Sequence, residues 1–360
     1  MPVKANFTKF LLKWHKKENT RSMPWKGEKD PYKIWLSEVI LQQTRVEQGW
    51  AYYERFLEAF PTIGELASAP EQKVFKLWEG LGYYSRCRNL IASAKKVVSD
   101  YGGKFPSTYE EIRELKGVGP YTAAAIASFA FNLPHAVVDG NVVRVLSRYF
   151  GLFTPIDTTA GKKEYTELAD SLLDRKEPGI YNQAIMDFGA VVCKPQNPLC
   201  AICIQRTDCQ ALKKGLVAQL PVKEKSIRKR QRWLTYFIVE TPDEKVYIRQ
   251  RTGKDIWEDL FEFVCWETDK EVYSEEVLKS DFVRQLFGGQ ALTVRYISRI
   301  YRQELSHQSI RGQFITIRLE KPLPALKGYL HVAKENLDQY AFPKFINTWL
   351  QDGTPVHNLF

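Results

Sequence analysis

A group of four closely spaced cysteines restricts most strongly what this chain can fold into. Cys193, Cys200, Cys203 and Cys209 follow the spacing Cys-x6-Cys-x2-Cys-x5-Cys. A disulfide framework spreads its cysteines more widely, so the cluster predicts a metal site instead. Four thiolates suit a [4Fe–4S] cluster or a zinc ion. Zinc sites usually pair two Cys-x2-Cys knuckles across a longer gap, whereas this loop has one knuckle between single cysteines. We therefore expect a [4Fe–4S] cluster, and zinc is the alternative.

The hydrophobic pattern changes near residue 220 and divides the chain into two domains. Up to that point apolar residues recur at helical spacing, for example Trp35, Leu36 and Val39. Beyond a basic stretch that starts at Pro221, short runs typical of strands appear. These runs are 232–239, 245–249 and 313–318, and helical patterns lie near 275–287 and 343–350. We expect an all-α domain over residues 1–220, a basic linker over 221–232 and a smaller α+β domain over 233–360.

The chain carries a formal net charge of +10 and has a pI near 9.1. An excess of basic side chains suits a polyanionic partner, nucleic acid before membrane, although a merely solubilising surface gives the same charge. The N-terminal residues lack the apolar core of a signal peptide, and the longest apolar stretch, 123–131, is too short to span a bilayer. We expect a monomer that is not secreted and stays in the cytoplasm, or wherever the DNA is, with Cys87 and Cys265 in hydrophobic cores.

The segment Leu115-Lys-Gly-Val-Gly-Pro-Tyr-Thr-Ala123 indicates a tight turn that leads into an apolar helix. Gly117 and Gly119 allow the backbone to turn sharply and to approach another surface closely. Pro120 suits the first position of a helix, and the free N–H groups at a helix start form a phosphate site. An isolated Gly-Val-Gly is usually only a turn. In a basic protein with a cysteine loop, it resembles the helix–hairpin–helix of DNA repair glycosylases.

Two carboxylates stand at helical positions that suit acid–base chemistry. Asp139 comes just before a helix in Val137-Val-Asp-Gly-Asn-Val-Val-Arg144. It can serve simply as the N-cap, but a helix N-terminus would also keep it ionised and able to stabilise a cationic sugar. Glycoside chemistry generally pairs such an anion with a second carboxyl that acts as the acid. Glu38 lies about 60° from Trp35 around its helix, on the flank of the apolar face. Partial burial there would raise its pKa and let it donate a proton; a solvated glutamate is the alternative.

Several segments together resemble the endonuclease III superfamily, and within it the MutY family of adenine DNA glycosylases. The helix–hairpin–helix, the Val-Asp-Gly-Asn segment and the cysteine loop match that pattern. So do Arg21-Ser-Met-Pro-Trp25, Ser37-Glu-Val-Ile-Leu-Gln-Gln-Thr44 and Gly80-Leu-Gly-Tyr-Tyr-Ser-Arg86. The resemblance covers almost the whole chain. It implies an enzyme that removes adenine mispaired with 8-oxoguanine, or with guanine, from double-stranded DNA.

The resemblance also implies roles for individual residues. Glu38 would protonate the departing adenine and later position or activate water, and Asp139 would stabilise the sugar cation or a covalent adduct of it. Tyr121 and Asn141 would support these carboxylates. Tyr121 stands where bifunctional relatives carry a lysine. Because tyrosine has no amine to form a Schiff base, we expect a monofunctional enzyme that leaves an abasic site. The residues implied to line the adenine pocket are Arg21, Met23, Trp25, Leu41 and Gln183.

Base flipping costs roughly a few kcal/mol of stacking and pairing energy, so a wedge must replace the contacts that the DNA loses. Gln43 and Tyr83 match groups that the family inserts into the DNA stack. The second domain resembles the Nudix-like recognition domain of this family, but lacks the Arg-Glu-x-x-Glu-Glu helix of Nudix hydrolases, so we expect no pyrophosphate hydrolysis. Leu305-Ser306-His307 aligns with the loop that reads 8-oxoguanine, where the family usually has Phe-Ser-His. Thr44 would assist this loop.

Two other functions stay open. One is a glycosylase of the same superfamily that acts on another base, such as an oxidised pyrimidine or a mismatched thymine. Tyr121 argues against the lyase type, and the second domain argues against the compact thymine glycosylases. The other is a catalytically silent damage-binding protein, against which the presence of both Glu38 and Asp139 argues.

Overall fold

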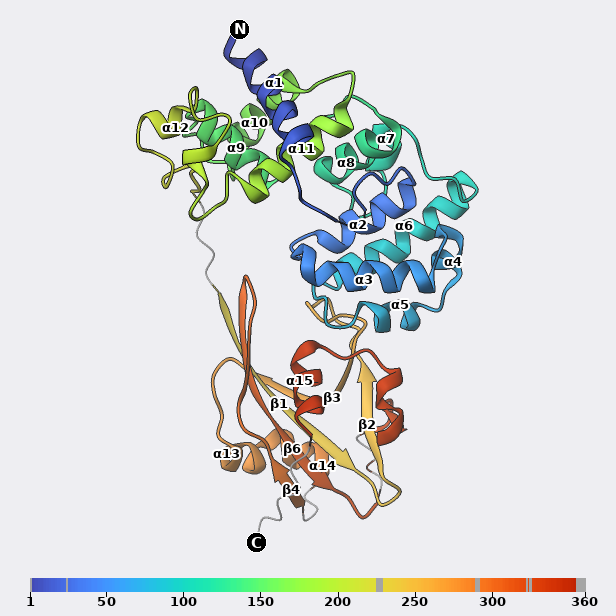
Figure 1. The fold of residues 1–360 in the computed structure, drawn as a ribbon. Coiled ribbons are helices and arrows are strands. Elements are labelled where there is room, and N and C mark those ends of the chain that lie inside the picture. The colour runs from blue at the N-terminus through green and yellow to red at the C-terminus, as the bar shows by residue number, and fades with distance from the viewer. Residues whose placement is uncertain are drawn as a thin grey trace. The chain divides into compact units, whose positions relative to one another are not determined.

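The computed structural model describes residues 2–23, 25–224, 229–288, 292–321, 323 and 326–353 (Figure 1). The chain forms two compact units. The first contains Met1–Ala69 and Arg88–Lys225, and the second contains Pro70–Cys87 and Ser226–Phe360. Up to residue 224 every regular element of the described residues is helical, which confirms the expected all-α part of the chain. None of the described helices has the length and apolar character needed to cross a membrane.

The helical part of the chain is built from short and medium-length helices. They are α1 (Pro2–Lys17), α2 (Pro31–Leu41), α3 (Val46–Ala59), α4 (Ile63–Ser68), α5 (Glu71–Trp78), α6 (Ser85–Tyr101), α7 (Tyr109–Arg113), α8 (Pro120–Phe131), α9 (Gly140–Phe150), α10 (Thr159–Leu172), α11 (Pro178–Val191), the 3-10 helix η1 (Cys200–Ile202) and α12 (Gln210–Lys213).

The core of the first unit lies between α1, α8, α9, α10 and α11. Phe7, Leu11 and Trp14 form one face of α1 and are buried there. The ring of Phe7 lies 4.7 Å from that of Tyr149, and the ring of Trp14 meets Phe188 edge-on at 5.0 Å. Each large side chain of this kind contributes about 1.5–3 kcal/mol when it leaves water. This packing attaches the N-terminal helix to the helices that carry the candidate site.

Local signals in the sequence explain where the key helices begin. Asp30 caps α2 by accepting a hydrogen bond from the N–H of Tyr32, and Pro31 occupies the first helical position. Helix α8 likewise begins with Pro120, as expected, directly after the turn that follows α7. Gly117 in that turn has a φ of +80°, and a Cβ on it would lie 2.7 Å from the side chain of Asn89. The helix–hairpin–helix therefore needs glycine there for both conformation and space.

The second unit is built on a mixed sheet. Its strands are β1 (Arg230–Glu240), β2 (Lys245–Gln250), β3 (Phe261–Thr268), β4 (Thr293–Ile297), β5 (Tyr301–Glu304), β6 (Gln308–Arg318) and β7 (Leu330–Ala333). In the described residues the order is β4-β6-β1-β3-β2-β7, with β5 paired to β6. The central strands β1 and β6 run parallel, in register from Arg230 opposite Gln308 to Glu240 opposite Arg318, and the other pairs are antiparallel.

Both faces of this sheet are covered. On one face Phe237 and Ile315 pack with Phe287 of α14 (Asp281–Phe287) and with α13 (Ser274–Lys279). On the other, Phe314 stacks on Trp349 of α15 (Lys344–Asp352) at 4.7 Å. Alternate residues of the central strands point to opposite faces, so burial on both sides explains their nearly continuous apolar runs. The 3-10 helix η3 (Lys334–Gln339) follows β7.

The expected strands and the helix near 343–350 are confirmed, and one expectation is corrected. The helical pattern over 275–287 is two helices instead of one, because the chain turns at Ser280. The Ser280 side chain accepts a hydrogen bond from the N–H of Val283 and so starts α14 afresh. Cys87 is fully buried, and Cys265 is partly buried on β3.

The segment Pro70–Cys87 groups with the second unit although its flanking sequence belongs to the first. The Glu79 carboxylate accepts a hydrogen bond from the N–H of Phe342 at 2.7 Å, and the Lys76 ammonium donates to the carbonyl of Tyr340 at 3.0 Å. Helix α5 and the loop that carries Tyr83 are thus attached to the sheet-containing unit.

Candidate active site

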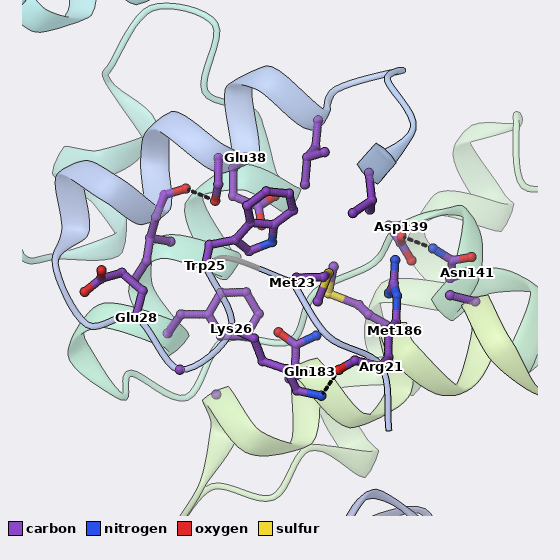
Figure 2. Close-up of a pocket in the computed structure, with 18 of the residues that line it drawn as sticks. Arg21, Met23, Trp25, Lys26, Glu28, Glu38, Asp139, Asn141, Gln183 and Met186 are labelled. Atoms are coloured by element: carbon purple, nitrogen blue, oxygen red, sulfur yellow. Dashed lines mark hydrogen bonds between the residues drawn. The ribbon is translucent and has the colours of Figure 1, made fainter. Parts of the chain in front are cut away.

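A pocket of about 740 Å³ opens in the first unit between the α1–α2 loop, α2, the starts of α8 and α9, and α11 (Figure 2). Its volume suits a ligand the size of a small molecule or a nucleobase. Ten residues singled out from the sequence line it together: Arg21, Met23, Trp25, Glu38, Leu41, Thr44, Tyr121, Asp139, Asn141 and Gln183. The fold therefore collects, from segments far apart in the chain, residues with acid–base, stacking and hydrogen-bonding capacity.

Glu38 is more deeply buried than its flank position on α2 suggested. Only 6% of the residue is exposed. Burial raises the pKa of Glu38 to about 7; a hydrogen bond from Tyr121 opposes this shift and the negative charge of Asp139 adds to it. A carboxyl group with a pKa near neutrality is present in both protonation states under physiological conditions, which is what a general acid that later acts as a base requires. The solvated-glutamate alternative is therefore wrong.

Asp139 is both the N-cap of α9 and a wall of the pocket. Its carboxylate accepts hydrogen bonds from the N–H of Val142 at 2.7 Å and from the Asn141 amide at 2.8 Å, the latter drawn in Figure 2. We expected the helix start to keep its pKa low, but burial raises the pKa of Asp139 above its ordinary value. Those two hydrogen bonds and the charge of Arg144 act in the opposite direction. Desolvation outweighs the capping interactions because the carboxylate is largely surrounded by protein.

Arg144 organises the residues around Asp139. Its guanidinium donates to the Asn141 side-chain oxygen at 2.7 Å and to the Gly189 carbonyl at 2.6 Å. Since the Asn141 oxygen is occupied by Arg144, the nitrogen of that amide must face Asp139. The first turn of α9 is in this way joined to the end of α11, and the carboxylate is held in one orientation.

The opposite side of the pocket is apolar with a few polar groups. Met23 and Trp25 are buried, and the Trp25 ring meets Tyr53 edge-on at 5.3 Å. Figure 2 shows Met23, Trp25 and Gln183 grouped on this side, with Met186 beside them. A planar base placed here would contact aromatic and sulfur-containing side chains while polar groups reach its edge.

Asp187 is a residue of this region that the sequence reasoning did not find. Its side chain is fully buried and forms an ion pair with Arg21 at 2.8 Å and with Lys26 at 3.4 Å. It also accepts hydrogen bonds from Asn19 at 2.7 Å and from Gln183 at 2.9 Å. The spacing of four residues between Gln183 and Asp187 on α11 was visible in the sequence, but Arg21, the ion-pair partner of Asp187, lies far away in the chain.

Six of the residues predicted for catalysis or DNA binding lie outside this pocket: Gln43, Tyr83, Gly117, Gly119, Ser306 and His307. Gln43 and Tyr83 are both exposed and both have a left-handed backbone, with φ of +57° and +49°. Such strain in residues other than glycine occurs preferentially at functional positions. Gly119 is the N-cap of α8, and no side chain caps this helix, so its first N–H groups are available to a phosphate.

Ser306 and His307 form the exposed tip of the hairpin between β5 and β6. The N–H of Leu305 donates to the carbonyl of Gln308 at 2.8 Å and closes the turn. Within the second unit, the Ser306 hydroxyl lies 3.2 Å from the hydroxyl of Tyr83. The hairpin tip and the tyrosine loop therefore present polar groups side by side.

The four clustered cysteines line one small pocket between α9 and the loop after α11. The Arg148 guanidinium donates to the Cys193 sulfur at 3.5 Å, and the Arg148 carbonyl lies 3.5 Å from the Cys209 sulfur. Burial raises the pKa of the Cys193, Cys203 and Cys209 thiols, and at Cys193 the Arg148 cation acts in the opposite direction, toward the thiolate that a metal centre requires. In the part of the chain that the structure describes, no three His, Cys, Asp or Glu side chains are already gathered around a single-ion site. The donor set, four sulfurs with an arginine beside them, fits an iron–sulfur cluster.

Comparisons with known proteins agree with this architecture. Residues 36–171 match the HhH-GPD superfamily base excision DNA repair protein family, and residues 235–352 match the NUDIX domain. The adenine DNA glycosylase of Buchnera aphidicola subsp. Baizongia pistaciae is 35% identical over 260 residues, which are 71% of this chain and 73% of that relative. The adenine DNA glycosylase of Homo sapiens is 44% identical over 210 residues, 56% of this chain and 38% of that relative.

The fold of the first unit also matches solved structures. A thermostable thymine-DNA glycosylase superposes with a TM-score of 0.55 at 30% identity, and the match covers 59% of this chain and 98% of that one. These findings confirm a helix–hairpin–helix domain followed by a Nudix-like domain.

Proposed function

Because the chain belongs to the adenine DNA glycosylase family, we propose that it removes adenine paired with 8-oxoguanine or guanine in double-stranded DNA and leaves an abasic site. That it is a base-excision-repair glycosylase, which hydrolyses an N-glycosidic bond, follows from the family itself. What we propose beyond the family is the identity of the base opposite the adenine and a reaction that leaves the strand uncut. The main support for this chemistry is that Glu38 is buried in the same cleft as Asp139 and that its pKa is raised to about 7.

The proposed reaction uses the two carboxyl groups differently. Protonated Glu38 gives its proton to the departing adenine as the bond between base and sugar breaks and its electron pair moves to the base. Asp139, which is oriented by hydrogen bonds from Val142 and Asn141, acts in its ionised form and stabilises the positive charge that develops on the sugar. Water then adds to the sugar carbon and returns a proton to Glu38. A pair of carboxyl groups, one acting as the acid and the other as an anion, is the usual arrangement for glycoside cleavage.

The lysines of the pocket support a monofunctional reaction. Tyr121 hydrogen-bonds to Glu38 and offers no amine at that position. Lys26 donates to the Arg21 carbonyl at 2.7 Å and pairs with Asp187, and Lys29 donates to the Phe129 carbonyl at 3.0 Å. An ammonium held by acceptors is a poor nucleophile, so a Schiff base with the sugar is disfavoured.

The proposed base pocket consists of Met23, Trp25 and Leu41 as stacking and packing surfaces, with Arg21 and Gln183 at the edge of the base. Glutamine reads adenine through the exocyclic amine, a donor, and N7, an acceptor. Gln43 and Tyr83 are proposed to enter the DNA stack, and the start of α8 at Gly119, after the Gly117 turn, to bind a phosphate. Their exposure and backbone geometry support these roles.

Lesion recognition is proposed for Ser306 and His307, with assistance from Thr44. 8-Oxoguanine differs from guanine by an N7 hydrogen, which donates, and an added oxygen, which accepts. The hairpin tip offers a hydroxyl and an imidazole that can meet both, and the Tyr83 hydroxyl stands next to Ser306. Leu305 supplies less packing area against the lesion base than the phenylalanine usual in this family.

We propose a [4Fe–4S] cluster bound by Cys193, Cys200, Cys203 and Cys209, which surround one pocket. The cluster would be structural and would fix the loop between α11 and α12, which carries the basic residues Lys194 and Arg206. No step of base removal passes through it.

A glycosylase assay tests the proposal. Duplexes carrying adenine opposite 8-oxoguanine, guanine or thymine, and thymine opposite guanine, are incubated with enzyme in excess. We expect adenine release opposite 8-oxoguanine first, then opposite guanine, and little opposite thymine. Release of thymine with adenine untouched would assign the enzyme to another base, and tight binding without release would make it a damage-binding protein.

A separate variant tests whether the hairpin tip recognises the lesion. Ser306→Ala with His307→Ala should lower the rate ratio between the 8-oxoguanine and guanine pairs about tenfold or more, since each base-edge contact contributes about 1–3 kcal/mol of discrimination. Thr293→Ala, exposed on β4, is the control. If both rates fall together at a constant ratio, the hairpin contributes only general affinity.

A further inference from the structure

Asp187 connects two residues of the proposed base pocket through a single oxygen atom. Its Oδ1 accepts from the Arg21 guanidinium at 2.8 Å and from the Gln183 amide nitrogen at 2.9 Å. Its Oδ2 accepts from Asn19 at 2.7 Å and lies 3.4 Å from the Lys26 ammonium. The carboxylate is fully buried and touches none of the reacting groups. Three of its four partners lie in the α1–α2 loop and the fourth on α11, so the loop and the helix together determine its position.

The chemistry of Asp187 determines how the Gln183 amide is oriented. The two ends of a glutamine amide have nearly the same shape, so either end can face a partner unless that partner selects one. A carboxylate paired with two cations accepts hydrogen bonds and donates none. Gln183 must therefore turn its nitrogen to Asp187 and its oxygen away from it. Among the described residues, none donates a hydrogen bond to that oxygen, and Gln183 lines the pocket (Figure 2).

The orientation matters because the purine bases differ at one position of the edge that glutamine reads. Adenine offers an amine that donates and N7 that accepts, whereas guanine and hypoxanthine carry an oxygen that accepts in place of the amine. An amide whose oxygen is fixed toward the base pairs with the adenine amine and repels the oxygen of the other two. The reversed amide would present its nitrogen and would accommodate guanine or hypoxanthine.

We propose that Asp187 is a positioning residue that fixes the Gln183 amide in the orientation that accepts adenine and rejects 6-oxopurines. This inference rests on the proposed function, because it assumes that the base enters this pocket. Hydrogen bonds to charged groups are strong enough to bias an amide about tenfold or more. Asp187 thus contributes to the choice of base without contacting it.

The test compares deoxyadenosine with deoxyinosine, each opposite 8-oxoguanine, in single-turnover assays. Hypoxanthine, the base of deoxyinosine, keeps N7 and exchanges the amine for an oxygen. In Asp187→Asn the neighbouring side chain can donate as well as accept, so both orientations of Gln183 are satisfied. We expect the ratio of adenine to hypoxanthine release to fall about tenfold or more relative to wild type. Each ratio is taken within one preparation, so a lower folded fraction cancels.

A second variant separates the effect of Asp187 on the orientation of the Gln183 amide from its effect on protein stability. Gln183→Glu combined with Asp187→Asn preserves the net charge and the hydrogen bond between the two positions, now donated by Asn. Both oxygens of glutamate accept, so this side chain has no wrong orientation, and we expect the ratio to return toward the wild-type value even if the rates are lower. Asp170→Asn, at an exposed ion pair with Arg175, is the control and should leave the ratio unchanged.

The outcomes distinguish a failure of the proposed role of Asp187 from a failure of the proposed function. An unchanged ratio in Asp187→Asn, or a ratio that stays low in the double variant, overturns the role of Asp187. If Asp187→Asn does not fold, the double variant alone carries the test, with a ratio at the wild-type level in favour and a collapsed ratio against. If wild-type protein releases no adenine, the proposed function fails first.

Discussion

Gly189 of α11 lies against Asn141 of α9 so closely that a Cβ on Gly189 would stand 2.7 Å from the Asn141 Cβ and 2.9 Å from its carbonyl oxygen. Real Cβ atoms do not approach each other this closely, so only glycine allows the two helices to meet. Helix α9 begins with Asp139, and α11 carries Gln183 and Asp187. The contact therefore sets the distance between the proposed sugar-stabilising carboxylate and the proposed base-reading residues.

We expect Gly189→Ala to lower the free energy of unfolding by about 1–3 kcal/mol, because the added methyl forces α9 and α11 apart. Adenine release should fall more than the loss of folded protein explains, since Asp139 moves relative to Gln183. Gly64→Ala is the control, because a Cβ there has only an ordinary contact, 3.8 Å from Thr62. Denaturant unfolding and single-turnover assays of both variants measure the effect; equal stability of the two would contradict it.

Glu38→Gln should abolish base release and preserve binding to lesion DNA. The proton of Glu38 assists the departure of the base, whereas affinity comes mainly from phosphate contacts and stacking. A positioned acid contributes about 10²–10⁴ in rate, and here one group serves twice. Single-turnover rates and gel-shift titrations check this, with exposed Glu58→Gln as the control. A near-normal rate would remove Glu38 from the mechanism.

The same variant should be more stable than wild type at high pH. Burial raises the pKa of Glu38 from 4.5 to about 7, so between these values the folded protein binds one more proton than the unfolded chain. The contribution of Glu38 to wild-type stability therefore falls as pH rises through this interval, and Gln at this position avoids the loss. The difference in free energy of unfolding, variant minus wild type, should grow by roughly 2–3 kcal/mol from pH 5 to pH 8. Denaturant titrations at several pH values measure it, and a difference that does not vary with pH would show that Glu38 ionises like an exposed glutamate.

The enzyme should leave the DNA strand intact. Tyr121 offers no amine, and the two lysines of the pocket are held by acceptors. We expect cleaved strands only after alkali or heat, with the same sample before and after treatment as its own control. Borohydride added during the reaction should trap little protein on DNA. An adduct that forms as fast as free adenine would overturn the monofunctional assignment.

Purified protein should be brown and contain about four iron atoms per chain, because four thiols surround one pocket. Cys203→Ala should lose most of the iron and the visible absorption, whereas Cys265→Ala, in the second unit, should keep both. Metal analysis by mass spectrometry checks this. One zinc per chain with negligible iron after anaerobic preparation would favour the zinc alternative.

Several features of this protein were determined by short stretches of sequence. Asp139 had to cap α9, and Pro120 had to start α8, because these preferences depend on the residues immediately around them. The short runs of β-branched, aromatic and other apolar residues in β1 and β6 likewise predicted strands, since such residue preferences are a local property. The spacing of the four clustered cysteines is also a feature of one short stretch of sequence.

Other features were decided only by the tertiary structure. The pKa of Glu38 depends on burial by segments that its own helix does not contain, and the rise in the pKa of Asp139 reverses what its cap position alone suggested. The role of Asp187 requires Arg21, more than 160 positions away, to reach the same oxygen as Gln183. Desolvation and long-range hydrogen bonding depend on what surrounds a group in space, and a chain read residue by residue contains the groups but not their distances.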